Sequence, residues 1–133
     1  MKKPNWQKAL SDLIRQRLTT PFAWGEHDCC LFASDCAVAM AGIDPAEEYR
    51  GRYTTEIGAK RILTTTHGSI EQAFDACFER IEPNSAQRGD LVMYESELGK
   101  TVGVVWASEL WSAGLNGVGV VREFAPITAW RID

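Results

Sequence analysis

Two adjacent cysteines follow an aspartate that is well placed to begin a helix. Asp28 is a strong N-cap residue, because its carboxylate accepts hydrogen bonds from backbone N–H groups that the first turn leaves unpaired. Cys29 would then take the first helical position, where free N–H groups and the helix dipole favour the thiolate, the nucleophilic form of cysteine. The same N–H groups could stabilise an oxyanion. The segment therefore predicts a thiol nucleophile at the start of a helix.

A nucleophilic cysteine needs a base, and the chain has two histidines, His27 and His67. His27 lies two residues before Cys29, so its ring either reaches the sulfur or points away from it. His67 follows a run of threonines, and the sequence does not give its place in the fold. Both are candidate bases. The simpler alternative is that each is an ordinary loop histidine and that Cys29 is a half-buried thiol without a reaction.

The spacing of the four cysteines is not that of a metal site. Cys29, Cys30 and Cys36 lack the C-x2-C pattern of structural zinc. Cys36 and Cys77 fall on apolar helix faces and are expected in the core. We therefore expect neither a metal nor another cofactor, and a redox role of the cysteines remains an alternative.

Other residues with possible functional roles have simpler structural interpretations. Tryptophans in a chain of this size belong mostly to the core. Trp111 lies in a loop-like segment, Leu110–Ser112, and we expect it to be exposed and available to a partner. Asp90 precedes an apolar run, and we expect its carboxylate to bond backbone amides at the start of a strand.

Length and composition set the broad class of protein. The chain has 133 residues, which is the length of one domain over residues 1–133. Its net charge of −4 argues against a nucleic-acid-binding protein. No apolar run approaches the roughly 20 residues that cross a bilayer. The lysines at the N-terminus precede an amphipathic stretch, so we expect no signal peptide, and thiols rather than disulfides in a reducing cytosol.

Apolar spacing and capping residues place the elements. Three- and four-residue spacing and N-cap residues predict helices from Trp6 to Leu18, from Asp28 to Gly42, at Asp44–Glu47, after Thr55 and after Ser69. From Pro83 onward, β-branched and aromatic runs punctuated by glycine and proline predict strands within 91–94, 102–106, 118–121 and 127–132. Helices followed by strands favour an α+β fold with the helices packed on one antiparallel sheet.

Several motifs, in order, resemble the NlpC-type peptidases, small papain-like enzymes that cleave the peptide stems of bacterial cell walls. Phe22–Gly25, Asp28–Cys29 and Gly89–Val92 match the family's aromatic-x-Trp-Gly, Asp-Cys and Gly-Asp-Leu-Val elements. Thr101–Val104 matches the His-Val-Gly element except at its first residue. The likeness covers residues 20 to 132 and is closest to a short phage and prophage branch, which Gly51–Tyr53 and Ala129–Arg131 also resemble.

This resemblance implies a papain-like α+β domain with the cysteine helix against the sheet. It places an N-terminal helix in 1–20, a helical half in 21–80 and an antiparallel sheet of four to five strands in 88–132. A cleft at the helix N-terminus would contain Asp28, Cys30, Trp24 and Thr101 beside Cys29. The family's catalytic histidine, however, falls on Thr101, which cannot act as a base near neutral pH.

The resemblance, together with the positions where this sequence differs from the family, implies two possible functions. The first is a phage or prophage tail-tip or tail-assembly component that keeps the fold without the chemistry, has other tail proteins as partners, and is found in the virion tail or, before assembly, in the bacterial cytoplasm. The second is an active cysteine hydrolase or amidase that cleaves peptidoglycan peptides, with Cys29 as nucleophile and His67 or His27 as base. A histidine supplied by a partner chain would also complete the pair.

Overall fold

Four α-helices precede the strands along the described chain. The computed structural model describes residues 1–97 and 99–133. The helices are α1 (Trp6–Arg17), α2 (Cys29–Ala41), α3 (Glu56–Thr66) and α4 (Ile70–Asp75), and a short 3-10 helix spans Pro83–Ser85. The strands are β1 (Glu79–Ile81), β2 (Leu91–Ser96), β3 (Gly99–Trp106), β4 (Glu109–Gly114), β5 (Gly117–Val121) and β6 (Pro126–Arg131). The fold is α+β, as predicted.

One antiparallel sheet has the order β1-β6-β2-β3-β4-β5. Consecutive hairpins join β2 to β5, and β6 returns to lie between β1 and β2. The described residues therefore form six strands, and the expected four to five was wrong. The prediction missed β1, which has only three residues, and β4, which lies in the segment taken as a loop.

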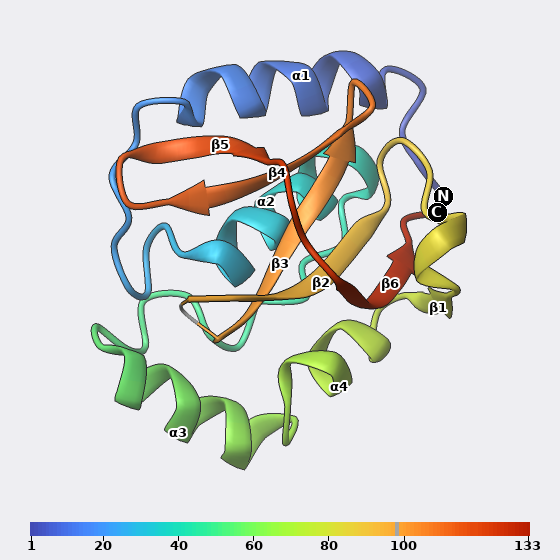
Figure 1. Cartoon of the computed structure of the whole chain (residues 1–133). Helices are drawn as coiled ribbons and strands as arrows, with labels where there is room; N and C mark the ends of the chain where they lie inside the picture. The colour runs from blue at the N-terminus through green and yellow to red at the C-terminus, as the bar shows by residue number, and fades with distance from the viewer. Residues whose placement is uncertain (98) are drawn as a thin grey trace.

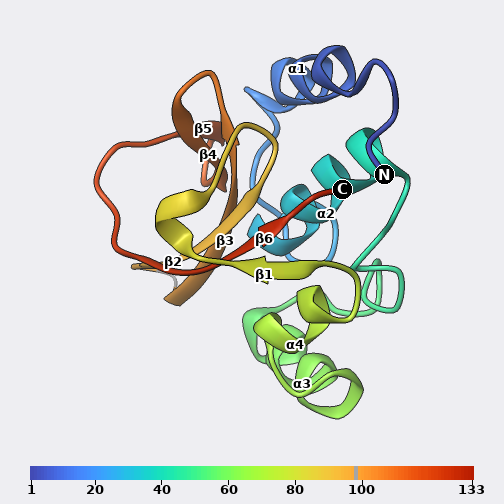
Figure 2. The ribbon, with the colours of Figure 1, turned by 90° about the vertical axis from the view of Figure 1, so that its right-hand side faces the viewer.

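The helices lie around the sheet in two groups (Figure 1). Helices α1 and α2 pack on one side of it, whereas α3 and α4 lie together at one end (Figure 2). The main core forms where Phe32, Ala33 and Met40 of α2 meet alternate residues of the sheet, such as Met93 and Val102. Since α2 is apolar on most of its surface, it is the buried central helix that the sequence predicts.

Four of the five predicted helices are confirmed. Asp28, Thr55 and Ser69 each cap a helix through their side chains, and Gly42 ends α2 in the left-handed conformation. The helix expected at Asp44–Glu47 was wrong. The chain there forms hydrogen-bonded turns, because the Asp44 carboxylate accepts from Ala46 N at 2.9 Å and also holds the Arg50 guanidinium.

Other predictions about single residues have mixed outcomes. Asp90 has the structural role expected of it, since its carboxylate accepts from the backbone of Gln87 and Ile132. Cys36 is fully buried, and Cys77 packs against the core. Trp111, expected in an exposed loop, is half-buried in β4 and donates its indole N–H to the Trp106 carbonyl at 2.9 Å. Among the described residues, no helix is long and apolar enough to cross a membrane.

Candidate functional site

The Asp28 carboxylate organises the start of α2. One oxygen accepts from the backbone N–H of Leu31 at 2.9 Å, which is the expected cap. The other accepts from Gly25 N at 3.2 Å and from the Tyr53 hydroxyl at 2.5 Å. These three donors hold a carboxylate that is only 2% exposed. Burial and the adjacent Asp28 charge raise the pKa of Tyr53, so the phenol stays protonated and remains a donor.

The loop before α2 and the turn at 49–53 fit together without space for a side chain at Gly25. Gly25 has a φ of +82°, and a Cβ there would lie 1.9 Å from the Tyr53 carbonyl oxygen. The amide of Gly51 also donates to the Gly25 carbonyl at 3.0 Å. This close approach brings Tyr53 to Asp28. It also explains why a glycine follows Trp24 in the Trp-Gly motif.

Cys29 and Cys30 form a thiol pair, with their sulfurs 3.9 Å apart. The hydrogen bond from Cys30 lowers the pKa of the Cys29 thiol against the effect of its burial, and backbone hydrogen bonds with Val102 and Cys30 lower it further. The same hydrogen bond, together with burial, raises the pKa of Cys30 well above its ordinary value. Of the two thiols, Cys29 is therefore the one that loses its proton more readily, and Cys30 is the one that can donate to the thiolate.

Strand β3 presents the backbone of Val102 to Cys29. Pairing between β3 and β4 is confined to residues 104–106 of β3 and 109–111 of β4, so Val102 lies where the two strands separate. The Val102 carbonyl accepts from the Ser112 hydroxyl at 3.2 Å. Burial raises the pKa of the neighbouring Tyr94 phenol, and the Cys29 charge raises it further. The polar surroundings of Cys29 on the sheet side are therefore hydroxyl groups and backbone amides.

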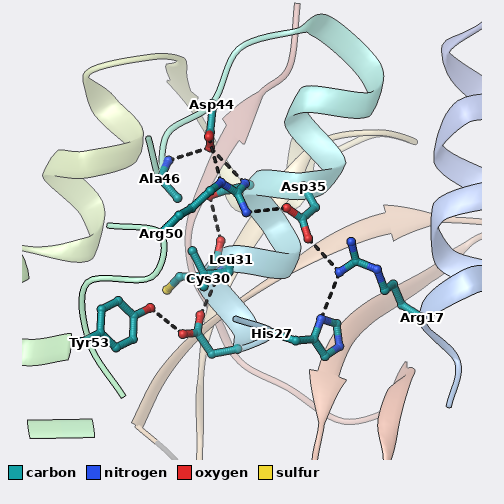
Figure 3. A network of polar contacts seen from close by, with 11 residues as sticks. Arg17, His27, Cys30, Leu31, Asp35, Asp44, Ala46, Arg50 and Tyr53 are labelled. Carbon is teal, nitrogen blue, oxygen red and sulfur yellow. Dashed lines mark hydrogen bonds and ion pairs between the residues drawn. The ribbon is translucent and has the colours of Figure 1, made fainter. Parts of the chain in front are cut away.

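His27 points away from Cys29. Its Nδ1 contacts Arg17 Nη1 at 3.2 Å, and Arg17 in turn forms an ion pair of 2.8 Å with Asp35. Figure 3 shows His27 and Arg17 to one side of the α2 N-terminus and the Cys30 sulfur to the other. Burial, reinforced by the Arg17 charge, lowers the pKa of His27. Its Nε2 is buried and has no hydrogen-bond partner in residues 1–97 and 99–133.

His67 is the C-cap of α3, and its Nδ1 makes a short hydrogen bond with the Tyr49 hydroxyl. Tyr49 is buried and lies in the wall of the cavity beside the cysteines, whereas His67 is not among the residues that line it. Neither histidine is hydrogen-bonded to Cys29 in the described part of the chain. His67 therefore reaches the site only through Tyr49.

Thr101, at the position of the family's histidine, is 3% exposed. Its hydroxyl is hydrogen-bonded to the Ser96 hydroxyl at 2.7 Å and to the Gly99 carbonyl at 3.1 Å. These bonds belong to the β2–β3 hairpin, so Thr101 stabilises the hairpin rather than the thiol. The hydrogen bond from strand β3 to Cys29 comes from the backbone of Val102, the neighbour of Thr101.

A cavity of about 350 Å³ lies between the start of α2, helices α3 and α4, and the β2–β3 hairpin. Cys29, Cys30, Asp28 and Trp24 line it, as expected of cleft residues, whereas Thr101 is not one of its lining residues. Most of the wall is apolar; representative residues are Phe22, Leu31, Ala59, Leu63, Ile70 and Phe74. The volume lies near the lower end of the ~300–1,000 Å³ typical of ligand pockets.

Glu71 and Lys100 form an ion pair in the wall, which also contains the charged side chains of Glu56 and Lys60. Lys100 Nζ lies 2.9 Å from Glu71 Oε2, while Glu71 Oε1 is buried without a partner in the described residues. Burial favours a higher pKa for Glu71, but the hydrogen bond and the charge of Lys100 act against it, and the net pKa is lowered. Glu71 is therefore a carboxylate at neutral pH.

Several residues of this site escaped the sequence analysis. Tyr53, Tyr94 and Ser112 were not candidates, because each reaches the site through tertiary contacts across long stretches of sequence. For Tyr53 a signal did exist, in the resemblance of Gly51–Tyr53 to the phage branch. Glu71 was not a candidate either, because its place in the first turn of the helix after Ser69 does not indicate which cavity its carboxylate faces.

The site has no obvious metal ligands, since residues 1–97 and 99–133 contain no group of three or more His, Cys, Asp or Glu side chains placed to hold an ion. A comparison with curated proteins finds no match. A family model does match, over residues 1–132, nearly the whole chain, and its description is "Domain of unknown function (DUF6950)". The chain therefore belongs to the DUF6950 family.

Proposed function

We propose that the protein is a structural, partner-binding component with an NlpC-like, papain-like fold whose cysteine has lost its histidine. One observation carries the proposal: His27 and His67 are both engaged elsewhere, by Arg17 and Tyr49, while Thr101 takes part in the β2–β3 hairpin. Cys29 thus has a stabilised thiolate but no imidazole to move protons. The resemblance to a phage and prophage branch suggests a tail component with other tail proteins as partners.

The experiment compares the wild type with Cys29→Ser in two assays. The first measures binding to the products of neighbouring tail genes by co-purification and light scattering. The second measures cleavage of muropeptides between pH 5 and 9. We expect a stable complex that the substitution leaves unchanged, and no cleavage by either protein. Cleavage by the wild type that Cys29→Ser abolishes would overturn the proposal, and so would a chain that stays monomeric with every neighbour.

A cysteine hydrolase is the second candidate, because the lowered pKa of Cys29 and the adjacent cavity suit a nucleophile. Here His67 would act through Tyr49, which lines the cavity and contacts its Nδ1. Cleavage would then be lost in both Tyr49→Phe and His67→Gln and retained in His27→Gln. Equal loss in all three variants would reflect damage to the fold.

A further inference from the structure

We infer that Cys29 is an acylation site, and that the cavity beside it holds an apolar acyl chain of about ten carbons, carried on the sulfur as a thioester. The inference rests on the proposed function, because a lasting thioester requires a cysteine that does not go on to hydrolyse it. It assigns a covalent modification to Cys29 and names the chemical class of the donor.

The first step of the argument is the sulfur itself. Cys30 S–H, Val102 N–H and Cys30 N–H all favour negative charge on Cys29. A thiolate in such surroundings is the nucleophilic form and attacks carbonyl carbons. Backbone amides at a helix N-terminus are also the groups that stabilise the negative oxygen of an attacked carbonyl.

The second step is the fate of the product. In an active cysteine hydrolase an imidazole activates the water that releases the acyl group. Within residues 1–97 and 99–133, neither histidine is hydrogen-bonded to Cys29. The cavity wall next to the sulfur is mainly apolar, with Phe22, Leu31 and Phe74 among its residues, so a chain seated there would exclude water from the thioester. The features that make this site a poor hydrolase therefore make it a lasting acceptor.

The third step is size. A methylene group takes about the space of a water molecule, whose share of the liquid is about 30 Å³. A cavity of about 350 Å³ therefore accepts a chain of about ten carbons.

The reaction balances with an acyl thioester as donor. The Cys29 thiolate attacks the carbonyl carbon, a new carbon–sulfur bond forms, and the bond from that carbon to the donor's sulfur breaks. The donor leaves as a thiolate and takes a proton from water. No electron transfer is involved, and the chain stays on Cys29.

The test uses the full chain with decanoyl-coenzyme A, and acetyl-coenzyme A as the short-chain comparison. Intact-mass and peptide spectra should show one decanoyl group on Cys29, removed by neutral hydroxylamine. The label should be absent from Cys29→Ser and unchanged in the matched Cys77→Ser. Decanoyl transfer should exceed acetyl transfer at least tenfold. Failure to label Cys29, or equal transfer of the two groups, would overturn the inference.

A cavity-filling variant keeps the test independent of cysteine loss. Ala59→Trp on α3 fills the cavity, while Ile57→Trp is a control on the same helix, because Ile57 is 65% exposed and is not a lining residue. We expect Ala59→Trp to reduce decanoyl transfer at least tenfold and to leave acetyl transfer unchanged. Equal decanoyl transfer in both variants would contradict the cavity as the chain's site. These outcomes are separate from partner binding and muropeptide cleavage, which test the proposed function.

Discussion

The two sides of the α2 N-terminus differ in how their polar groups are satisfied. On one side, Asp35 lies between Arg17 and Arg50, and each charge has an opposite partner within 2.8 Å (Figure 3). On the other side, Cys29 and Cys30 have each other and backbone amides, and the wall opens into an apolar cavity. The ion pairs on the first side hold the helix in place. The second side places the two cysteines in the wall of the cavity.

The largest effect should come from the ion-pair side. Asp35→Ala leaves Arg17 and Arg50 without their shared partner, although Arg50 keeps Asp44. Because both arginines are partly exposed, we expect a loss of about 2 kcal/mol in the free energy of unfolding, below the ~3–5 kcal/mol of fully buried pairs. Urea denaturation measures it. Asp12→Ala, which removes an exposed ion pair with Lys8, should cost much less, because exposed ion pairs contribute little to stability. Equal costs would mean that the ion-pair side does not fix α2.

The second largest effect should come from the residue that ties the cysteine loop to the 49–53 turn. Tyr53→Phe removes one of three donors to the buried Asp28 carboxylate, at a cost of about 1.5 kcal/mol in the free energy of unfolding. The matched variant Tyr49→Phe removes a hydrogen bond with the His67 ring rather than with a carboxylate, and it should cost less, about 1 kcal/mol. If Tyr53→Phe proved as stable as the wild type, Asp28 would not depend on the phenol.

A smaller effect should appear on the cavity side. Cys30→Ala removes the S–H that donates to the Cys29 thiolate, so the pKa of Cys29 should rise. An S–H group is a weak donor, and losing a hydrogen bond worth about 1 kcal/mol corresponds to a roughly fivefold smaller thiolate population at neutral pH. The rate of iodoacetamide alkylation at Cys29 as a function of pH measures this. Cys30→Ser keeps a donor and should react at nearly the wild-type rate. A faster reaction in Cys30→Ala would show that the pair opposes the thiolate.

The smallest effect is a dependence of stability on pH at His27. Since its pKa is lowered in the folded protein, the neutral ring is the form that folding favours. Its contribution is complete above the unfolded pKa of about 6.5 and is lost as the pH falls through the folded pKa. Between pH 7.5 and 5, His27→Gln should therefore lose less stability than the wild type. Parallel losses in the two proteins would mean that the ring is protonated in the folded state.

The sequence predicted the elements whose signals are local. Asp28, Thr55 and Ser69 begin helices because a capping side chain acts within three residues of itself. The β3–β4 hairpin was missed because its turn lacks the usual Asn-Gly signal. Ala107 and Ser108 both adopt positive φ there, at 52° and 63°, a conformation that neither residue type indicates.

Much of the site lay beyond local signals. That Cys29 would begin a helix could be predicted, because the cap is a property of a few adjacent residues. The backbone of Val102 also lowers the pKa of the Cys29 thiol, and no local signal places this strand residue beside it. The direction of His27 could not be predicted. It depends on Arg17, ten residues earlier, which reaches it only after α1 packs on α2.

The close approach of Gly25 to the Tyr53 carbonyl has a consequence for how such domains can be recombined. The loop that carries the cysteine and the turn at 49–53 are shaped to each other's backbone, so neither can be exchanged alone between relatives. Chimaeras that transplant both segments together should fold, whereas those that transplant one should not. The two segments, separated in sequence by the whole of α2, therefore behave as one structural unit.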